Sequence, residues 1–243
     1  MMEKSSNDLE RRFLDLEENL KRIREEIAEA AARSGRKPEE ITLLAATKTV
    51  PVEVINHGIE IGLDHIGENR VQELCDKYDS LHKEQTDVQF IGHLQTNKVK
   101  YLIGKVSMIQ SVDSVKLAKE ISRLCTQNGS DMQVLIEVNI GKEANKSGIL
   151  PEKMPELVEE ISILPGIQVR GLMAIPPANA DSTEMDRYFS KMSDYFIDMK
   201  AKKIDNVTMD YLSMGMSADY AQAILQGANM VRVGSALFGA RQY

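Results

Sequence analysis

The chain has 243 residues, of which 42% are hydrophobic, and it carries a net charge of −7 with a pI of about 5.3. These values indicate a protein with a sizeable core, whose length suits either one large α/β domain or two small ones, and they exclude a general attraction to nucleic acid or to an anionic membrane. No apolar run is long enough for a signal peptide or a membrane span, so we expect a cytoplasmic protein.

The first predicted element is a long amphipathic helix over residues 7–34. Apolar residues recur at alternating spacings of four and three from Leu9 to Ile27, which is the pattern of a helix with one buried stripe. Asn7 followed by Glu10 resembles a capping box at its start. We expect this extra helix to cover the chain's own domain in a monomer, with a dimeric coiled coil as the alternative.

Residues 41–48 predict the first strand, buried on both faces. Lys48 ends this run. At a buried strand end, desolvation lowers the pKa of a lysine and makes its amine a nucleophile towards aldehydes. The alternative is a lysine whose stem is buried while its amine reaches solvent.

Strands and helices then alternate along the rest of the chain. Strands are predicted at residues 65–68, 88–92, 106–112, 132–140, 167–173, 208–212 and 230–234, and helices at 52–62, 71–78, 96–102, 113–125, 151–164, 183–202 and 217–227. Eight alternations without a domain-sized interruption predict a single (β/α)8 TIM barrel domain over residues 1–243. A doubly wound open sheet is the alternative.

Polar residues follow most of the predicted strands. The positions at the strand ends are Lys48, Glu68 with Asn69, His93, Ser111, Asn139, Met173, Ser213, and Gly234 with Ser235. Because ligands of such barrels bind at the carboxyl ends of the strands, we expect these residues to form one ring.

The loops after the seventh and eighth strands predict an anion site. Residues 212–217 and 234–238 each place a glycine beside a helix N-terminus, where free N–H groups favour an anion. Ser213 and Ser235 add hydroxyl groups, and barrels frequently bind phosphate after strands seven and eight. Each glycine taken alone is also consistent with an ordinary turn.

Arg232 lies between two valines on the predicted eighth strand, so its side chain points to the opposite face. A buried guanidinium needs a partner, either a carboxylate in a structural ion pair or a ring nitrogen of a ligand. With Lys48 and the phosphate loops, it suggests a ligand that has both an aldehyde and a phosphate. Pyridoxal 5′-phosphate and the sugar phosphate of a Schiff-base aldolase both fit.

Motifs along nearly the whole chain carry a resemblance. They are Ala-Ala-Thr-Lys-Thr at 45–49, His-Ile-Gly-Glu-Asn at 65–69, Phe-Ile-Gly-His-Leu-Gln-Thr-Asn-Lys at 90–98, Val-Asn at 138–139 with Lys-Ser-Gly at 146–148, Arg-Gly-Leu-Met at 170–173, Leu-Ser-Met-Gly-Met-Ser at 212–217 and Val-Arg-Val-Gly-Ser-Ala-Leu-Phe-Gly at 231–239. The chain resembles the pyridoxal-phosphate homeostasis protein family, single-domain relatives of the alanine racemase barrel.

The resemblance implies a fold-type III barrel that binds pyridoxal 5′-phosphate (PLP). Lys48 would hold the cofactor as a Schiff base, while Arg232 would face the pyridine nitrogen. The phosphate would be held by Ser213, Gly234 and Ser235, and further cofactor contacts are expected from Asn69, Met214, Gly215 and Met216.

Lys146 lies in a loop after the fifth predicted strand, from which it is placed to swing toward the barrel mouth. We expect it to act as a second lysine for PLP, because transfer of a covalently held cofactor needs a second amine. The alternative is a solvated loop lysine. We expect no metal site, since the histidines are not spaced as metal ligands are. Cys75 and Cys125 are expected to be reduced thiols.

A carrier is favoured over an enzyme. Arg232 at the pyridine nitrogen would weaken the ring as an electron sink, and a racemase needs acid–base groups on both faces of its substrate. Lys48 serves one face. The chain ends at Tyr243 after the eighth strand, so we expect it to lack the second domain that supplies the opposing tyrosine in alanine racemases.

The expected function is therefore a non-catalytic carrier in PLP (vitamin B6) homeostasis that delivers the cofactor to PLP-dependent apoenzymes. An amino-acid racemase with weak activity is the alternative. A sugar-phosphate aldolase finds no further support in the motifs.

Overall fold

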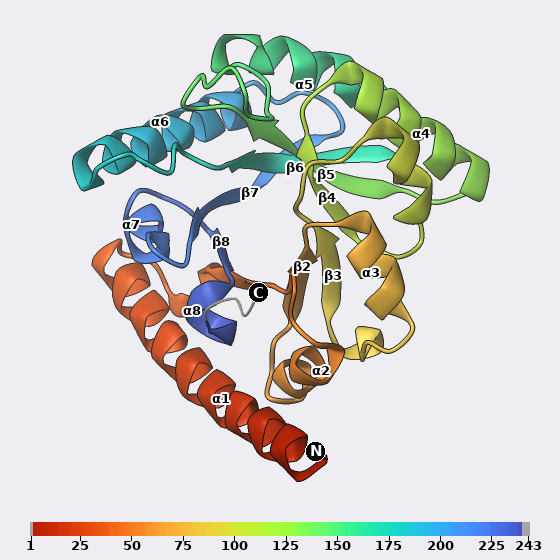
Figure 1. Ribbon diagram of the computed structural model, residues 1–243. Coiled ribbons are helices and arrows are strands. Elements are labelled where there is room, and N and C mark those ends of the chain that lie inside the picture. The colour runs from red at the N-terminus through yellow and green to blue at the C-terminus, as the bar shows by residue number, and fades with distance from the viewer. Residues whose placement is uncertain (1, 240–243) are drawn as a thin grey trace.

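Eight parallel strands close into a barrel in the computed structural model, which describes residues 2–239 (Figure 1). Each strand pairs with the next in sequence, and β8 returns to pair with β1. The strands are β1 Thr42–Ala46, β2 His65–Glu68, β3 Asp87–Phe90, β4 Met108–Val112, β5 Met132–Val138, β6 Ile167–Ala174, β7 Val207–Met216 and β8 Met230–Val233. The predicted (β/α)8 barrel is confirmed, and the open-sheet alternative is wrong.

Helices surround the strands, as Figure 1 shows. They are α1 Met2–Arg33, α2 Val52–Glu60, α3 Val71–Tyr78, α4 Val115–Asn128, α5 Met154–Ser162, α6 Ser182–Ala201, α7 Tyr220–Leu225 and α8 Ser235–Phe238, with short 3-10 turns η1 Pro38–Glu40, η2 Lys83–Gln85, η3 Thr96–Tyr101 and η4 Pro151–Lys153. The main hydrophobic core lies between the strands and these helices.

Local sequence signals set the ends of the longer helices. Asp181 and Glu184 form a reciprocal capping box at the start of α6, with N···O distances of 2.9 and 3.0 Å. At the end of α4, Gly129 adopts a left-handed conformation (φ 62°) that glycine allows without strain. These helices therefore begin and end where their own sequence satisfies the free backbone groups.

Side chains fill the inside of the barrel. Two small apolar clusters occupy it, one made of Leu44, Ile91 and Met230 and the other of Met108, Leu135 and Met173. All six are buried. The inside of the barrel is thus a packed core rather than a pore, and ligands of such barrels bind at the ends of the strands.

The extra helix α1 runs along the outside of the barrel beside α2, α7 and α8 (Figure 1). Asn19 Nδ2 donates to Leu237 O at 3.1 Å, and the Tyr220 hydroxyl donates to Glu26. The helix begins at Met2, so Asn7 lies inside it and the predicted capping box is wrong. Through these contacts α1 holds the helices that follow β7 and β8.

Arg36, between α1 and β1, caps the C-terminal end of α7. Its Nη1 donates to Ala228 O at 2.8 Å, and its Nη2 donates to Ile224 O. A cation that binds the last carbonyl groups of a helix satisfies free acceptors and opposes the negative end of the dipole.

We expect Arg36→Met to lower the free energy of unfolding by about 1–2 kcal/mol, because the carbonyl groups after α7 lose a charged donor. Urea unfolding followed by circular dichroism measures this change. Arg33→Met, which alters an exposed arginine at the end of α1, is the matched control. Equal effects of the two substitutions would contradict the capping role.

Candidate functional site

Lys48 lies in the turn after β1, two residues beyond the end of the strand. The predicted strand through Lys48 is therefore too long. The next residue, Thr49, has a φ of 62°, which ends the extended backbone. Lys48 is half-buried, and Thr47 before it is fully buried. Lys48 thus lies at the carboxyl end of the barrel, as a ligand-binding lysine requires.

The end of β8 lies directly beside the end of β1. A Cβ atom on Gly234 would lie 3.3 Å from Ala46 O, a distance shorter than most contacts that Cβ atoms make in proteins. Glycine at this position allows the loop that opens α8 to approach the residues leading to Lys48. The start of α8 and the strand end that leads to Lys48 therefore lie next to each other at the mouth.

The segment predicted as a loop after the seventh strand is largely strand. β7 continues to Met216, with Gly215 in the left-handed region at φ 91°. α7 begins only at Tyr220, after its N-cap Asp219. Gly215 therefore does not open the helix as predicted, but it does lie against the start of α7, since a Cβ atom on Gly215 would come within 3.0 Å of Tyr220 Cα. Met214 is fully buried, whereas Met216 is partly exposed at the strand end.

Ser217 joins the two loops that were predicted to bind an anion. Its hydroxyl oxygen accepts hydrogen bonds from the N–H groups of Gly234 and Ala236, both at 3.1 Å. Ser235 between them is exposed, and its hydroxyl forms no bond within residues 2–239. The sequence placed Ser217 only at the start of the helix predicted over residues 217–227, because nothing local indicates partners 17 and 19 residues away.

Arg232 and Ser213 face the interior of the barrel. The guanidinium donates to Ser213 Oγ at 2.6 Å and to Ala174 O at 3.0 Å, and Ser213 Oγ donates to Gln110 Oε1 at 2.7 Å. No carboxylate within residues 2–239 forms an ion pair with Arg232, so the structural ion pair considered for it is not found. The Ser213 hydroxyl is bound inside the barrel rather than beside Ser235.

The polar chain continues from Gln110 to the far side of the barrel. Gln110 Nε2 donates to Gln89 Oε1 at 2.6 Å, and Gln89 Nε2 donates to Asp87 Oδ2, also at 2.6 Å. His65 Nδ1 lies 3.1 Å from the same carboxylate oxygen. Side chains from β8, β7, β4, β3 and β2 are thus linked in one network, which is buried from Arg232 to Gln89 and about one-third exposed at Asp87 and His65.

Burial sets the acid–base properties of this region. Desolvation lowers the pKa of Arg232 to about 10, although Glu137 and Asp219 favour its charged form. Burial likewise raises the pKa of Glu137, against the hydrogen bond from Ser147 and the charge of Arg232. Arg232 remains a cation at neutral pH although it is only 4% exposed.

A cavity of about 650 Å³ opens on the β3, β5 and β6 side of the mouth. It is lined by His93, Glu137, Val138, Ala144, Asn145, Lys146, Ser147 and Ile175. Glu137 Oε1 accepts from the Ser147 hydroxyl at 2.9 Å, while Glu137 Oε2 has no hydrogen-bond partner among the described residues. Lys146 Nζ lies 3.0 Å from Glu143 Oε2. The structure thus places Lys146 on the wall of a mouth cavity, as predicted for a residue after the fifth strand.

Asn69 follows β2 at the mouth. Its Oδ1 is buried and has no hydrogen-bond partner within residues 2–239. A Cβ on Gly92 would lie 1.9 Å from Asn69 O, so the backbone before His93 packs closely on Asn69. A buried acceptor without a protein donor is consistent with a residue that contacts a ligand.

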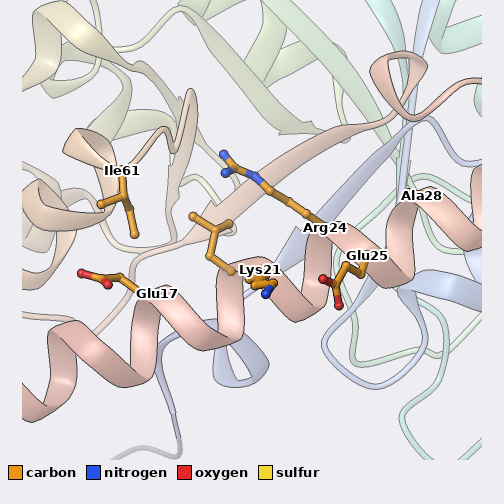
Figure 2. Close-up of a pocket in the computed structure, with 7 residues that line it drawn as sticks. Glu17, Lys21, Arg24, Glu25, Ala28 and Ile61 are labelled. Atoms are coloured by element: carbon orange, nitrogen blue, oxygen red, sulfur yellow. The ribbon is translucent and has the colours of Figure 1, made fainter.

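A second hollow, of about 520 Å³, lies outside the barrel between α1 and the residue after α2. Figure 2 shows Glu17 and Arg24 extending from α1 on the side of Ile61. Arg24 Nη2 donates to Gly62 O at 2.7 Å. Side chains of both signs line this hollow, and none of them comes from a strand end, so we do not assign the ligand to it.

Within residues 2–239, no group of three or more His, Cys, Asp and Glu side chains is placed to hold a metal ion. Cys75 and Cys125 are free thiols. No helix in the described part of the chain is long and apolar enough to cross a membrane.

Residues 17–242 match the family profile described as alanine racemase, N-terminal domain. The chain is 45% identical over 226 residues to the pyridoxal phosphate homeostasis protein of Aquifex aeolicus, which covers 93% of this chain and 98% of that protein. The likeness therefore extends over nearly the full length of both proteins.

Two solved structures share the fold closely. One is an unknown protein from Bifidobacterium adolescentis, 34% identical, with a TM-score of 0.89 over 93% of this chain and 95% of that one. The other is PipY of Synechococcus elongatus with PLP bound, 31% identical, with a TM-score of 0.77 over 88% of this chain and 100% of that one.

The contacts of Ser217 lead to a prediction for the ligand-free protein. Ser217→Ala removes the acceptor of two backbone N–H groups and should lower the free energy of unfolding by about 1–2 kcal/mol. Ser235→Ala should change it by less than about 0.5 kcal/mol, because that hydroxyl is exposed and unbonded. Urea titration of both variants tests this. If Ser217→Ala is as stable as Ser235→Ala, the hydrogen bonds of Ser217 between the two loops do not contribute to the free energy of unfolding.

Proposed function

The chain belongs to the family of pyridoxal phosphate homeostasis proteins, and we propose that it binds PLP and serves PLP (vitamin B6) homeostasis as a carrier. The observation that carries this proposal is the close approach of the α8 loop to the turn that bears Lys48, measured at Gly234 and Ala46. An amine and an anion-binding loop are what a phosphorylated aldehyde needs. PipY, a relative 31% identical, has PLP bound.

The residues present at the mouth are compatible with this cofactor. PLP supplies an aldehyde that condenses with a neutral amine and releases water, and we assign that amine to Lys48. We assign the phosphate to the N–H and hydroxyl of Ser235. Gly234 lets this loop approach Ala46, and its own N–H donates to Ser217, which orders the loop.

The remaining contacts follow from the same placement. We assign the ring nitrogen to Arg232, with Ser213 holding the guanidinium in orientation through the 2.6 Å hydrogen bond between them. Met214, Gly215 and Met216 lie at the end of β7, where Met216 pairs in register with Arg232. Asn69 offers its buried Oδ1 as a further contact.

A carrier suits these side chains better than a catalyst. A guanidinium with a pKa of about 10 does not give its proton to a pyridine nitrogen at neutral pH, and an unprotonated ring is a weak electron sink. We therefore propose that the protein holds PLP and delivers it to PLP-dependent apoenzymes without substantial racemisation of amino acids. We further propose that residues 1–243 act as one domain, in a cytoplasmic monomer.

We assign to Lys146 the role of a second amine for PLP. It lines the mouth cavity and its side chain is 36% exposed, and among residues 2–239 the only ion pair of its ammonium is with Glu143. Surface pairs of this kind contribute little free energy, so Lys146 is able to leave Glu143 at small cost. A second lysine in the mouth gives the cofactor an intermediate attachment before it leaves.

Borohydride reduction of the PLP-loaded protein, followed by peptide mapping, tests both lysines. We expect the stable pyridoxyl label on Lys48 in the parent protein and on Lys146 in Lys48→Ala. The double variant Lys48→Ala, Lys146→Ala should take up no specific label, and Lys119→Ala, an exposed lysine of α4, is the control. A parent protein labelled mainly at another lysine would refute the assignment of Lys48, and an unlabelled Lys146 in Lys48→Ala would refute the second role.

A further inference from the structure

Two side chains of α3 hold the peptide groups on either side of Lys48. Lys77 Nζ donates to Thr47 O at 3.0 Å, and the N–H of Thr49 donates to Glu73 Oε1. The backbone is therefore bound immediately before and immediately after the lysine. The sequence did not predict a role for Glu73 or Lys77, because both occupy ordinary polar positions of an amphipathic helix.

Glu68 completes a compact charged cluster with these two residues. Lys77 Nζ lies 2.9 Å from Glu68 Oε1 and 2.6 Å from Glu73 Oε1, and the Thr47 hydroxyl donates to Glu68 Oε1 at 2.7 Å. The side chains of Glu68, Glu73 and Lys77 are only 1%, 18% and 14% exposed. Burial raises the pKa of Glu68, while the ammonium of Lys77 opposes that rise. The single ammonium thus binds two carboxylates and a carbonyl group in a largely water-excluded place.

The conformation of the turn explains why such a cluster is needed. Thr49 has a φ of 62°, and this left-handed region is unfavourable for a β-branched residue. Such a conformation persists only when neighbouring groups hold it, and here Glu73 binds the N–H of the same residue. Without that bond, the turn is free to relax and the direction of the Lys48 side chain changes with it.

We infer that Glu73 and Lys77, together with Glu68, are positioning residues that aim the Lys48 amine at the aldehyde of its ligand. The inference rests on the proposed function in one respect, namely that this ligand is PLP. An amine attacks a carbonyl carbon efficiently only when it is held close to that carbon and correctly oriented. A turn that samples several conformations therefore slows the reaction. The cluster itself touches neither cofactor nor reacting atoms in this role.

The first test uses cofactor-free protein and needs no ligand. In Glu73→Ala, the amide hydrogen of Thr49 should exchange about tenfold faster than in the parent, the factor expected for loss of one hydrogen bond. Glu73→Gln keeps an oxygen acceptor and should stay close to the parent. Asp76→Ala removes an exposed acid from the same helix and should leave Thr49 unchanged. Similar exchange in all four proteins would overturn the inference.

The second test measures how fast added PLP becomes trappable by borohydride on Lys48. Glu73→Ala should be roughly tenfold slower or more, with Glu73→Gln restoring most of the rate and Asp76→Ala equal to the parent. Thermal unfolding verifies that each variant is folded. Faster exchange at Thr49 with an unchanged trapping rate would overturn the positioning role. A parent protein that forms no bond at Lys48 would instead refute the proposed function, and the exchange result would still decide whether the cluster holds the turn.

Discussion

The mouth of the barrel depends on the buried guanidinium of Arg232. A desolvated cation at the centre of a barrel needs partners, and Arg232 binds Ser213 of β7 and Ala174 O of β6. Ser213 then binds Gln110, which extends the network toward β3 and β2. This network occupies the barrel interior together with the two apolar clusters, so it fixes how the strand ends face one another. Among residues 2–239 no carboxylate contacts the Arg232 guanidinium directly, so a positive charge remains near the proposed PLP site.

The mouth has two sides with different chemistry. β1, β7 and β8 bring together Lys48, the exposed Ser235 and the glycine that lets their backbones approach. Around the other side, β3, β5 and β6 border a cavity that contains the buried Glu137 and the half-exposed Lys146. We interpret the first side as the place where PLP is held. We interpret the second side as the place from which the Lys146 amine reaches it. Such a division suits a protein that must both retain and release its ligand.

The sequence predicted the features that depend on local pattern. Alternating strands and helices indicated the barrel, and the place of Lys48 after a buried strand indicated its mouth. The predictions that were wrong concern contacts between residues that are distant in the sequence. Ser217 bonds to the loop after β8, Gly215 continues β7 as an irregular strand rather than opening a helix, and Arg232 binds a hydroxyl and a carbonyl in place of a carboxylate. No periodicity in one segment reports such long-range hydrogen bonds, so they became visible only in the folded chain.

The central claim, that this protein delivers PLP rather than only storing it, is tested most directly by transfer to an apoenzyme. Protein loaded with PLP is mixed with increasing concentrations of a PLP-dependent apoenzyme, and the gain of holoenzyme activity is followed with time. Direct delivery predicts a rate that rises with apoenzyme concentration beyond the rate at which PLP dissociates into buffer. A rate that stays equal to free dissociation at every apoenzyme concentration would contradict it.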